Sequence, residues 1–132
     1  NNIPIYKLNG AIGNWERAQG SALMEEWLNN YDNIDLVISN NDDMGLGAID
    51  AIERNNNIKG IKVVGIDGTK EALEAINEGK LLGTIESDKK EYAKAVVEIA
   101  MHSIGKSDLP DDVNAKLMEN RTYDVRQIPR VK

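Results

Sequence analysis

Side chains suited to holding a neutral polyol occur at three places along the chain, each directly after a predicted strand. The first place carries Trp15, the second carries Asn41 within the run Asn40–Asp43, and the third carries Asp67. An indole ring can cover the apolar C–H face of a sugar, while amide and carboxylate groups bind pairs of its hydroxyls. Because a buried polar group left unpaired costs about 1–3 kcal/mol, such a set discriminates strongly between ligands. One aromatic plate with an amide and a carboxylate beside it therefore predicts a sugar pocket.

Structural roles compete with this interpretation at several of the same positions. Trp15 also fits the apolar face of the helix predicted around it, and Trp27 fits that face from mid-helix. Asp42 and Asp43 suit the first turn of a helix, where the macrodipole favours anions. Asp67 precedes a glycine, and Asp-Gly is a common turn pair. The pattern favours a helix-terminal role for Asp42 and Asp43 and a core position for Trp27, and it leaves Trp15 and Asp67 open.

The elements that must position these side chains alternate between strand and helix. Predicted strands cover residues 3–8, 35–39, 61–66 and 81–85, and predicted helices cover 14–30, 43–55, 70–77 and 88–104. After Pro110 the pattern predicts two further strands, 114–118 and 122–128, joined as a β-hairpin. This alternation predicts an α/β fold with a parallel sheet and helices on both faces. In such sheets ligands bind beyond the carboxyl ends of the strands, which is where the three places lie.

Composition narrows the function classes. The 132 residues suit about one domain, and a net charge of −6 with both signs interspersed argues against a nucleic-acid partner. There is no Cys, and no apolar run approaches the roughly 20 residues of a membrane helix. The single histidine, His102, is predicted to be structural or solvent-facing. Without a phosphate-binding glycine loop or a Gly-x-Ser-x-Gly motif, a binding protein is predicted in preference to an enzyme.

The first residues, Asn-Asn-Ile-Pro-Ile, are typical of entry into a strand and are preceded by neither a signal peptide nor an initiator Met. We therefore expect an excised piece of a longer protein.

Four segments at and around the three places resemble the type I periplasmic solute-binding proteins, in order and over nearly the whole chain. They are Asn14–Gly20 (NWERAQG), Ile38–Ile49 (ISNNDDMGLGAI), Val64–Gly68 (VGIDG) and Gly79–Thr84 (GKLLGT). The resemblance is strongest to the glucose/galactose-binding branch. It implies a partial C-terminal sugar-binding lobe over 1–87, followed by a hinge-crossing helix and terminal strands over 88–132. The N-terminal lobe and the first βα units would lie outside this chain.

The resemblance also implies roles for single residues. The stacking tryptophan would be Trp15, the hydroxyl-binding amide Asn41 and the sugar-binding carboxylate Asp67. Arg17 occupies the place of an arginine that contacts the sugar in ribose-binding relatives. Asp35 falls where the glucose/galactose branch has a carboxylate that completes the shell of a structural calcium ion, although the loop that supplies most of that shell is absent from this chain. No other cofactor is implied.

The function implied by the resemblance is that of the substrate-binding component of an ABC sugar transporter. Such a protein would lie in the periplasm, or outside the cell as a lipoprotein in a Gram-positive organism. Glucose or galactose would bind the open lobe, and a hinge near 84–88 and 110–114 would close the other lobe over it. The closed form would be recognised by the membrane permease subunits or by a chemotaxis receptor.

Two alternatives come from other classes. The effector domain of a LacI-type transcription regulator has the same fold and a similar Asn-Asp segment. A Rossmann-like enzyme would require a cofactor loop that is not found in the sequence.

Overall fold

The computed structural model of the chain forms two compact units, which are described separately. It describes residues 4–55, 60–114 and 125–131. The first unit comprises Asn1–Ile85 with Arg130–Lys132, and the second comprises Glu86–Pro129. The chain thus leaves the first unit within the hinge segment predicted at 84–88, whereas the segment predicted at 110–114 lies inside the second unit. We keep two points as predictions. One is the assignment of 1–87 to a sugar-binding lobe and of 88–132 to a hinge-crossing helix with terminal strands. The other is the hinge.

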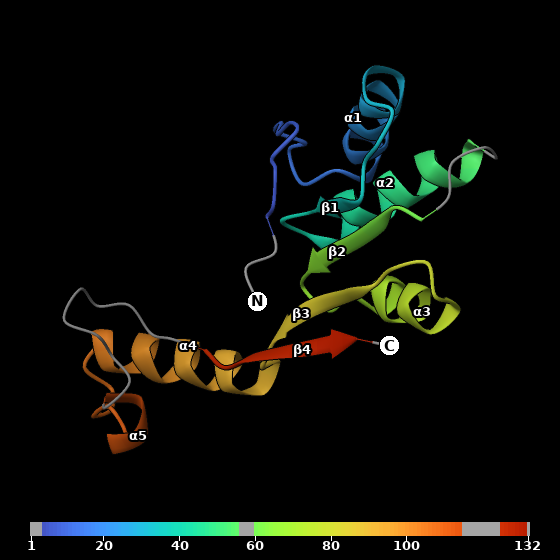
Figure 1. Cartoon of the computed structure of the whole chain (residues 1–132). Helices are drawn as coiled ribbons and strands as arrows, with labels where there is room; N and C mark the ends of the chain where they lie inside the picture. The colour runs from blue at the N-terminus through green and yellow to red at the C-terminus, as the bar shows by residue number, and fades with distance from the viewer. Residues whose placement is uncertain (1–3, 56–59, 115–124, 132) are drawn as a thin grey trace. The chain divides into compact units, whose positions relative to one another are not determined.

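A four-stranded sheet carries the turns of interest (Figure 1). Its strands, in spatial order, are β1 (Leu36–Ile38), β2 (Lys62–Ile66), β3 (Gly83–Ser87) and β4 (Gln127–Val131). β1 is parallel to β2 and β2 is parallel to β3, with Val37 opposite Val63 and Gly65 opposite Thr84. The predicted parallel α/β sheet is therefore confirmed, and the carboxyl ends of β1, β2 and β3 meet at one edge.

The helices begin and end where their sequences supply capping groups. In the described residues they are α1 (Arg17–Asn30), α2 (Asp42–Arg54), α3 (Lys70–Glu78), α4 (Lys89–Ser103) and α5 (Asp111–Asn114). The N-cap side chains of α2, α3 and α4 each accept hydrogen bonds from backbone N–H groups in the first turn of the helix, and these side chains are Asn41, Thr69 and Asp88 respectively. α3 ends at Gly79, which adopts a left-handed φ of 79°. Among the described helices, none has the length and apolar composition needed to span a bilayer.

The core of the first unit lies between its helices and one face of the sheet. α2 packs on β1 and β2, and α1 packs on α2 (Figure 1). Trp27 is partly buried against this core, which confirms its predicted position. The buried core side chains are Met24, Val37, Leu46, Ala48, Ile49, Ala51, Val63, Ala72, Ala75, Ile76 and Leu81.

The other face of the sheet carries apolar side chains that are partly or largely exposed. Ile38 is 71% exposed, and Ile66 and Ile85, which are opposite each other in the register, are 38% and 37% exposed. The sequence predicts helices on both faces, because near-continuous apolar strands are typical of parallel sheets that are covered twice. Within the first unit the described helices α2 and α3 share one core.

Two glycines allow α1 and α2 to approach closely. A Cβ atom at Gly20 would lie 2.3 Å from the carbonyl oxygen of Met44. A Cβ atom at Gly47 would lie 2.0 Å from the carbonyl oxygen of Arg17. Because no side chain fits at either position, the glycines hold the start of α1 directly against α2.

The N-terminal predictions need correction. Residues 4–10 form no strand, and Ile5 and Tyr6 are 85% and 83% exposed. A strand requires a neighbour for its N–H and C=O groups, and the described sheet ends at β1 without reaching this segment. The first helix begins at Arg17 rather than at residue 14, because a turn over Gly13–Glu16 precedes it.

The start of the predicted C-terminal hairpin also needs correction. Asn114 ends helix α5 instead of starting a strand, and residues 115–124 lie outside the described residues. The last strand, β4, neighbours β3 in the sheet. His102 on α4 is exposed, as expected, with its Nδ1 atom 3.2 Å from the carbonyl oxygen of Ser107.

Candidate functional site

The turn before α1 places Trp15 in a strained backbone conformation. The N–H of Glu16 donates to the carbonyl oxygen of Gly13 at 3.0 Å, and the two central residues, Asn14 and Trp15, have φ values of 50° and 67°. Positive φ at both central residues is typical of a type I′ turn, which suits Asn but not a bulky side chain. The left-handed region costs a residue with a Cβ about 1–2 kcal/mol. Trp15 is 65% exposed, so the turn presents it to solvent and the core alternative is wrong.

Asn41 joins this first turn to the one that follows β1. Its Oδ1 atom accepts the N–H of Met44 at 2.9 Å, as expected for the N-cap of α2. Its Nδ2 atom donates to the carbonyl oxygen of Trp15 at 3.0 Å. These bonds use one of the two N–H groups of the amide and one of its acceptor positions. Asn41 is 7% exposed, so its amide lies at the base of the site and fixes the Trp15 backbone.

Asp67 lies in the turn that follows β2, and it is exposed. Its φ of 121° lies in a region that residues with a Cβ rarely adopt. Two bonds to β3 hold the turn: the Asp67 N–H donates to the carbonyl oxygen of Ile85 at 2.8 Å, and the Gly68 N–H donates to Thr84 Oγ1 at 3.3 Å. The turn is therefore a fixed element of the sheet edge.

Asp42 connects the turn after β1 to the turn after β2. It is fully buried, its Oδ1 accepts the Thr84 hydroxyl at 2.6 Å, and its Oδ2 accepts the Thr69 N–H at 2.7 Å. A Cβ atom at Gly65 would lie 2.3 Å from Oδ1, so the carboxylate lies directly over β2. The prediction that Asp42 begins a helix is confirmed, since it is the first residue of α2.

Together the adjacent residues Asn41 and Asp42 link all three turns. Asn41 binds the Trp15 turn directly, and Asp42 binds Thr69, two residues after Asp67. The structure thus places the predicted residues Trp15, Asn41 and Asp67 on connected turns of the first unit. Whether they contact a sugar stays a prediction.

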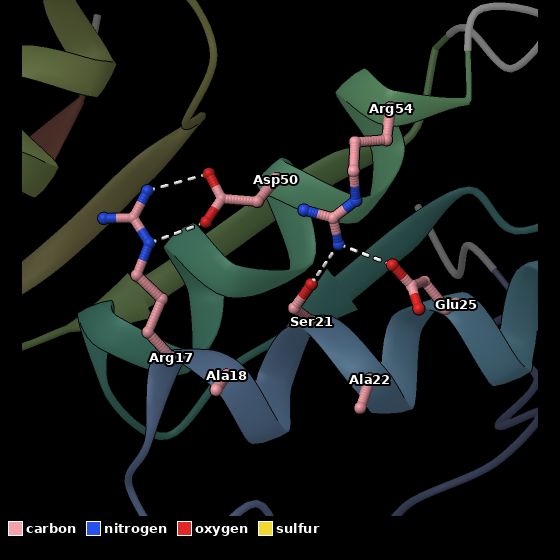
Figure 2. A pocket seen from close by; sticks show the side chains of 7 residues that line it. All are labelled: Arg17, Ala18, Ser21, Ala22, Glu25, Asp50 and Arg54. Carbon is pink, nitrogen blue, oxygen red and sulfur yellow. Dashed lines mark hydrogen bonds and ion pairs between the residues drawn. The ribbon is translucent and has the colours of Figure 1, made fainter.

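Arg17, the fourth predicted sugar contact, is bound to Asp50 (Figure 2). Its Nε and NH2 groups donate to the two Asp50 carboxylate oxygens, each at 2.7 Å. These hydrogen bonds lower the pKa of Asp50 below its ordinary value, and they raise the pKa of Arg17. The guanidinium therefore has a structural partner on α2, and its role toward a ligand stays a prediction.

The Arg17–Asp50 pair lines a shallow surface pocket of about 510 Å³ between α1 and α2 (Figure 2). Arg54, also from α2, donates to Ser21 and Glu25 of α1. The pocket is lined by Arg17, Ala18, Ser21, Ala22, Glu25, Asp50 and Arg54. Its charged groups pair with one another between the two helices. We therefore assign the pocket to the α1–α2 interface and not to the candidate site.

Asp35, the predicted calcium ligand, lies at the amino end of β1. It is exposed, and its carbonyl oxygen accepts the N–H of Lys62 at 2.9 Å. The candidate sugar residues Asn41 and Asp67 follow the opposite, carboxyl ends of β1 and β2. Within the described residues, no group of three or more His, Cys, Asp or Glu side chains could hold a metal ion. The calcium role of Asp35 stays a prediction.

The roles of Asp42 and Thr84 in holding the turns of the site were not predicted from the sequence. A signal for it exists in β2, where Gly65 interrupts an apolar strand. Glycine inside a strand often marks the close approach of another group. Here that group is the Asp42 carboxylate.

Comparison with known proteins identifies the family of the chain. Residues 2–107 match the model of the periplasmic binding protein domain. The chain is 36% identical over 90 residues to the D-galactose/methyl-galactoside binding periplasmic protein of Haemophilus influenzae, which covers 67% of this chain and 27% of that protein. It is 37% identical over 86 residues to the ribose import binding protein of Bacillus subtilis, covering 65% of this chain and 28% of that protein.

Solved structures show the same likeness. An ABC transporter periplasmic solute binding protein from Actinobacillus succinogenes with bound D-allose matches with a TM-score of 0.75 and 28% identity, over 91% of this chain and 38% of that one. A Bacillus halodurans solute binding protein with bound myo-inositol matches with a TM-score of 0.62 and 38% identity, over 76% of this chain and 39% of that one. The chain therefore spans well under half the length of the relatives that it matches.

Proposed function

The chain belongs to the periplasmic binding protein family, and from that premise we propose that it forms part of the sugar site of an ABC transporter's substrate-binding component. The observation that carries the proposal is the Trp15 turn. An exposed indole stands on a strained backbone that Asn41 holds in place with a 3.0 Å hydrogen bond. A fold that needed only a tight turn there would be more stable with glycine.

The site chemistry supports a monosaccharide. The indole offers an apolar plate, the Asn41 amide has further donor and acceptor capacity, and Asp67 offers a carboxylate for paired hydroxyls. Relatives are named for galactose and ribose, and related structures hold D-allose and myo-inositol. All are neutral polyols of similar size, which supports the class. Within it we propose glucose or galactose, on the resemblance of the segments that carry Asn41 and Asp67.

The proposed mechanism is lobe closure over the bound sugar. Sugar would bind first to Trp15, Asn41 and Asp67, and a second lobe would then cover it. Permease subunits, or a chemotaxis receptor, would recognise the closed form outside the cytoplasm. The related proteins are named as solute-binding proteins, which favours this role over a transcription regulator or an enzyme.

The test is calorimetric titration with D-glucose, D-galactose, D-ribose and myo-inositol. Trp27→Phe provides a background in which the fluorescence comes from Trp15 alone, because the chain has two tryptophans. We expect heat and a Trp15 fluorescence change with glucose or galactose. The heat should disappear in Trp15→Gly and in Asp67→Gly, and the Trp15 fluorescence change should also disappear in Asp67→Gly.

The two glycine variants also separate binding from folding. Each relieves a positive φ and should leave the fold equally or more stable, by up to about 1 kcal/mol. Loss of binding with retained stability supports a ligand-contacting role. Loss of stability in step with loss of binding would show that Trp15 and Asp67 are structural residues, and binding of none of the four polyols would contradict the proposed function.

A further inference from the structure

The carboxylate of Asp42 is fully buried and accepts hydrogen bonds from the Thr84 hydroxyl and the Thr69 N–H. We infer that Asp42 is a positioning residue: together with Thr84 it fixes the turn that carries Asp67 and so determines where the Asp67 carboxylate meets the ligand. The inference rests on the proposed function, since the carboxylate being positioned is the proposed sugar contact.

Three successive backbone N–H groups of this turn donate hydrogen bonds. The N–H groups of Asp67, Gly68 and Thr69 donate in order to the Ile85 carbonyl, the Thr84 hydroxyl and Asp42 Oδ2. The Thr84 hydroxyl in turn donates to Asp42 Oδ1 at 2.6 Å. Two of the three bonds therefore depend on Asp42, one directly and one through Thr84.

The backbone conformation of Asp67 depends on these hydrogen bonds. A φ of 121° on a residue with a Cβ persists only where the surroundings over-determine it. The three amide bonds supply that constraint. With the Asp42–Thr84 pair removed, the turn loses two of these three amide bonds and can relax toward a negative φ. That relaxation would redirect the Asp67 side chain.

Asp42 also affects Asn41, its neighbour at the start of α2. Asp42 directly follows Asn41, and both lie at the start of one helix whose approach to β2 requires Gly65. A shift of Asp42 would move Asn41 and, through its 3.0 Å bond, the backbone of Trp15. One buried carboxylate thereby sets the relative placement of all three proposed contacts.

The test compares four variants of the chain. Thr84→Val removes the hydroxyl at nearly constant volume, whereas Thr84→Ser keeps it. Asp42→Asn keeps the shape but presents an N–H group to one of the two donors. Ile76→Val is the matched control, because it trims a buried side chain of α3 outside this hydrogen-bonded set.

Two measurements are made on each variant. Proton–nitrogen NMR spectra without sugar report the Gly68 and Thr69 amides, and calorimetry with D-glucose and D-galactose reports affinity. We expect shifted Gly68 and Thr69 amides and roughly tenfold weaker binding in Thr84→Val and Asp42→Asn. Thr84→Ser should restore both properties, and Ile76→Val should change neither by a comparable amount.

The outcomes distinguish the inference from the function on which it rests. Unchanged affinity in Thr84→Val and Asp42→Asn, or equal weakening in Ile76→Val, would overturn the positioning role while the sugar site stood. Failure of the unaltered chain to bind either sugar would overturn the proposed function, and the inference with it, even where the Gly68 and Thr69 amides shift.

Discussion

Replacement of Gly47 by alanine should separate α1 from α2. The new Cβ atom would lie 2.0 Å from the Arg17 carbonyl oxygen, where ordinary contact begins at 3.4 Å. That oxygen belongs to a helix backbone and cannot move alone, so the two helices must move apart by roughly 1.4 Å, the difference between these distances. Overpacking of this kind costs about 1–3 kcal/mol, and we expect the upper end because backbone opposes the side chain. The better helix propensity of alanine offsets about 1 kcal/mol, which leaves a net loss of about 2 kcal/mol.

Gly45→Ala is the matched control in the same helix. Gly45 is also buried, but a Cβ atom there meets the Ser39 side chain at 3.4 Å, an ordinary contact. The control should therefore keep the gain in helix propensity and be more stable by up to about 1 kcal/mol.

The assay is urea unfolding followed by far-UV circular dichroism, with thermal unfolding beside it. We expect the midpoint temperature of Gly47→Ala to fall by roughly 8 °C, at roughly 4 °C per kcal/mol for a chain of this size. Because Arg17 follows the Trp15 turn so closely, folded Gly47→Ala should also bind sugar more weakly than Gly45→Ala does. Equal stability of the two variants would refute the close approach of the helices.

The remaining predictions concern two carboxylates whose pKa is lowered by hydrogen bonds. The Arg17 hydrogen bond lowers the pKa of Asp50 from 3.8, so the stability from this pair is present above pH 3.8 and is lost as the pH falls through the lower, folded value. The pair is partly exposed and contributes about 0.2–1 kcal/mol, so the urea midpoint of Asp50→Asn should differ from that of the unaltered chain at pH 6 but converge with it once the pH falls below the lowered pKa of Asp50. The pKa of Asp88 is lowered first by the Glu91 N–H and then by Arg126, so its contribution is likewise lost on acidification below pH 3.8. Asp88→Ala should speed hydrogen exchange of the Glu91 amide at neutral pH, whereas Asp88→Asn, which keeps a capping oxygen, should not; equal exchange in both variants would contradict the capping role.

The elements that the sequence predicted well are those fixed by local chemistry. The apolar run of β2 needs no distant information to be recognised as a strand. The ends of α3 are fixed by a capping side chain at Thr69 and a left-handed glycine at Gly79. α4 starts at Lys89 with Asp88 as its N-cap, within one residue of the predicted start at Asp88. Each signal lies within a few residues of the boundary that it sets.

The predictions that failed depended on distant partners or on competing local patterns. Residues 3–8 have the composition of a strand, but a strand also requires a neighbouring strand for its hydrogen bonds. Trp15 has helical spacing from Ala18 and Ala22, yet the Gly13–Asn14 pair favours a turn, and the turn prevails. The burial of Asp42 could not be predicted, because its two donors lie 27 and 42 residues further along the chain.

The strained residues connect the fold to the proposed site. Among the described residues other than glycine, positive φ occurs at Asn14, Trp15 and Asp67. The first two share one turn, and the last two are the residues that the sequence predicts as sugar contacts. At about 1–2 kcal/mol each, two such residues cost an appreciable part of the 5–15 kcal/mol that typically stabilises a folded domain. Glycine would remove that cost at both positions but would also remove an indole and a carboxylate. The retention of both side chains, each on a turn held by hydrogen bonds to neighbouring segments, is what a ligand site at this sheet edge requires.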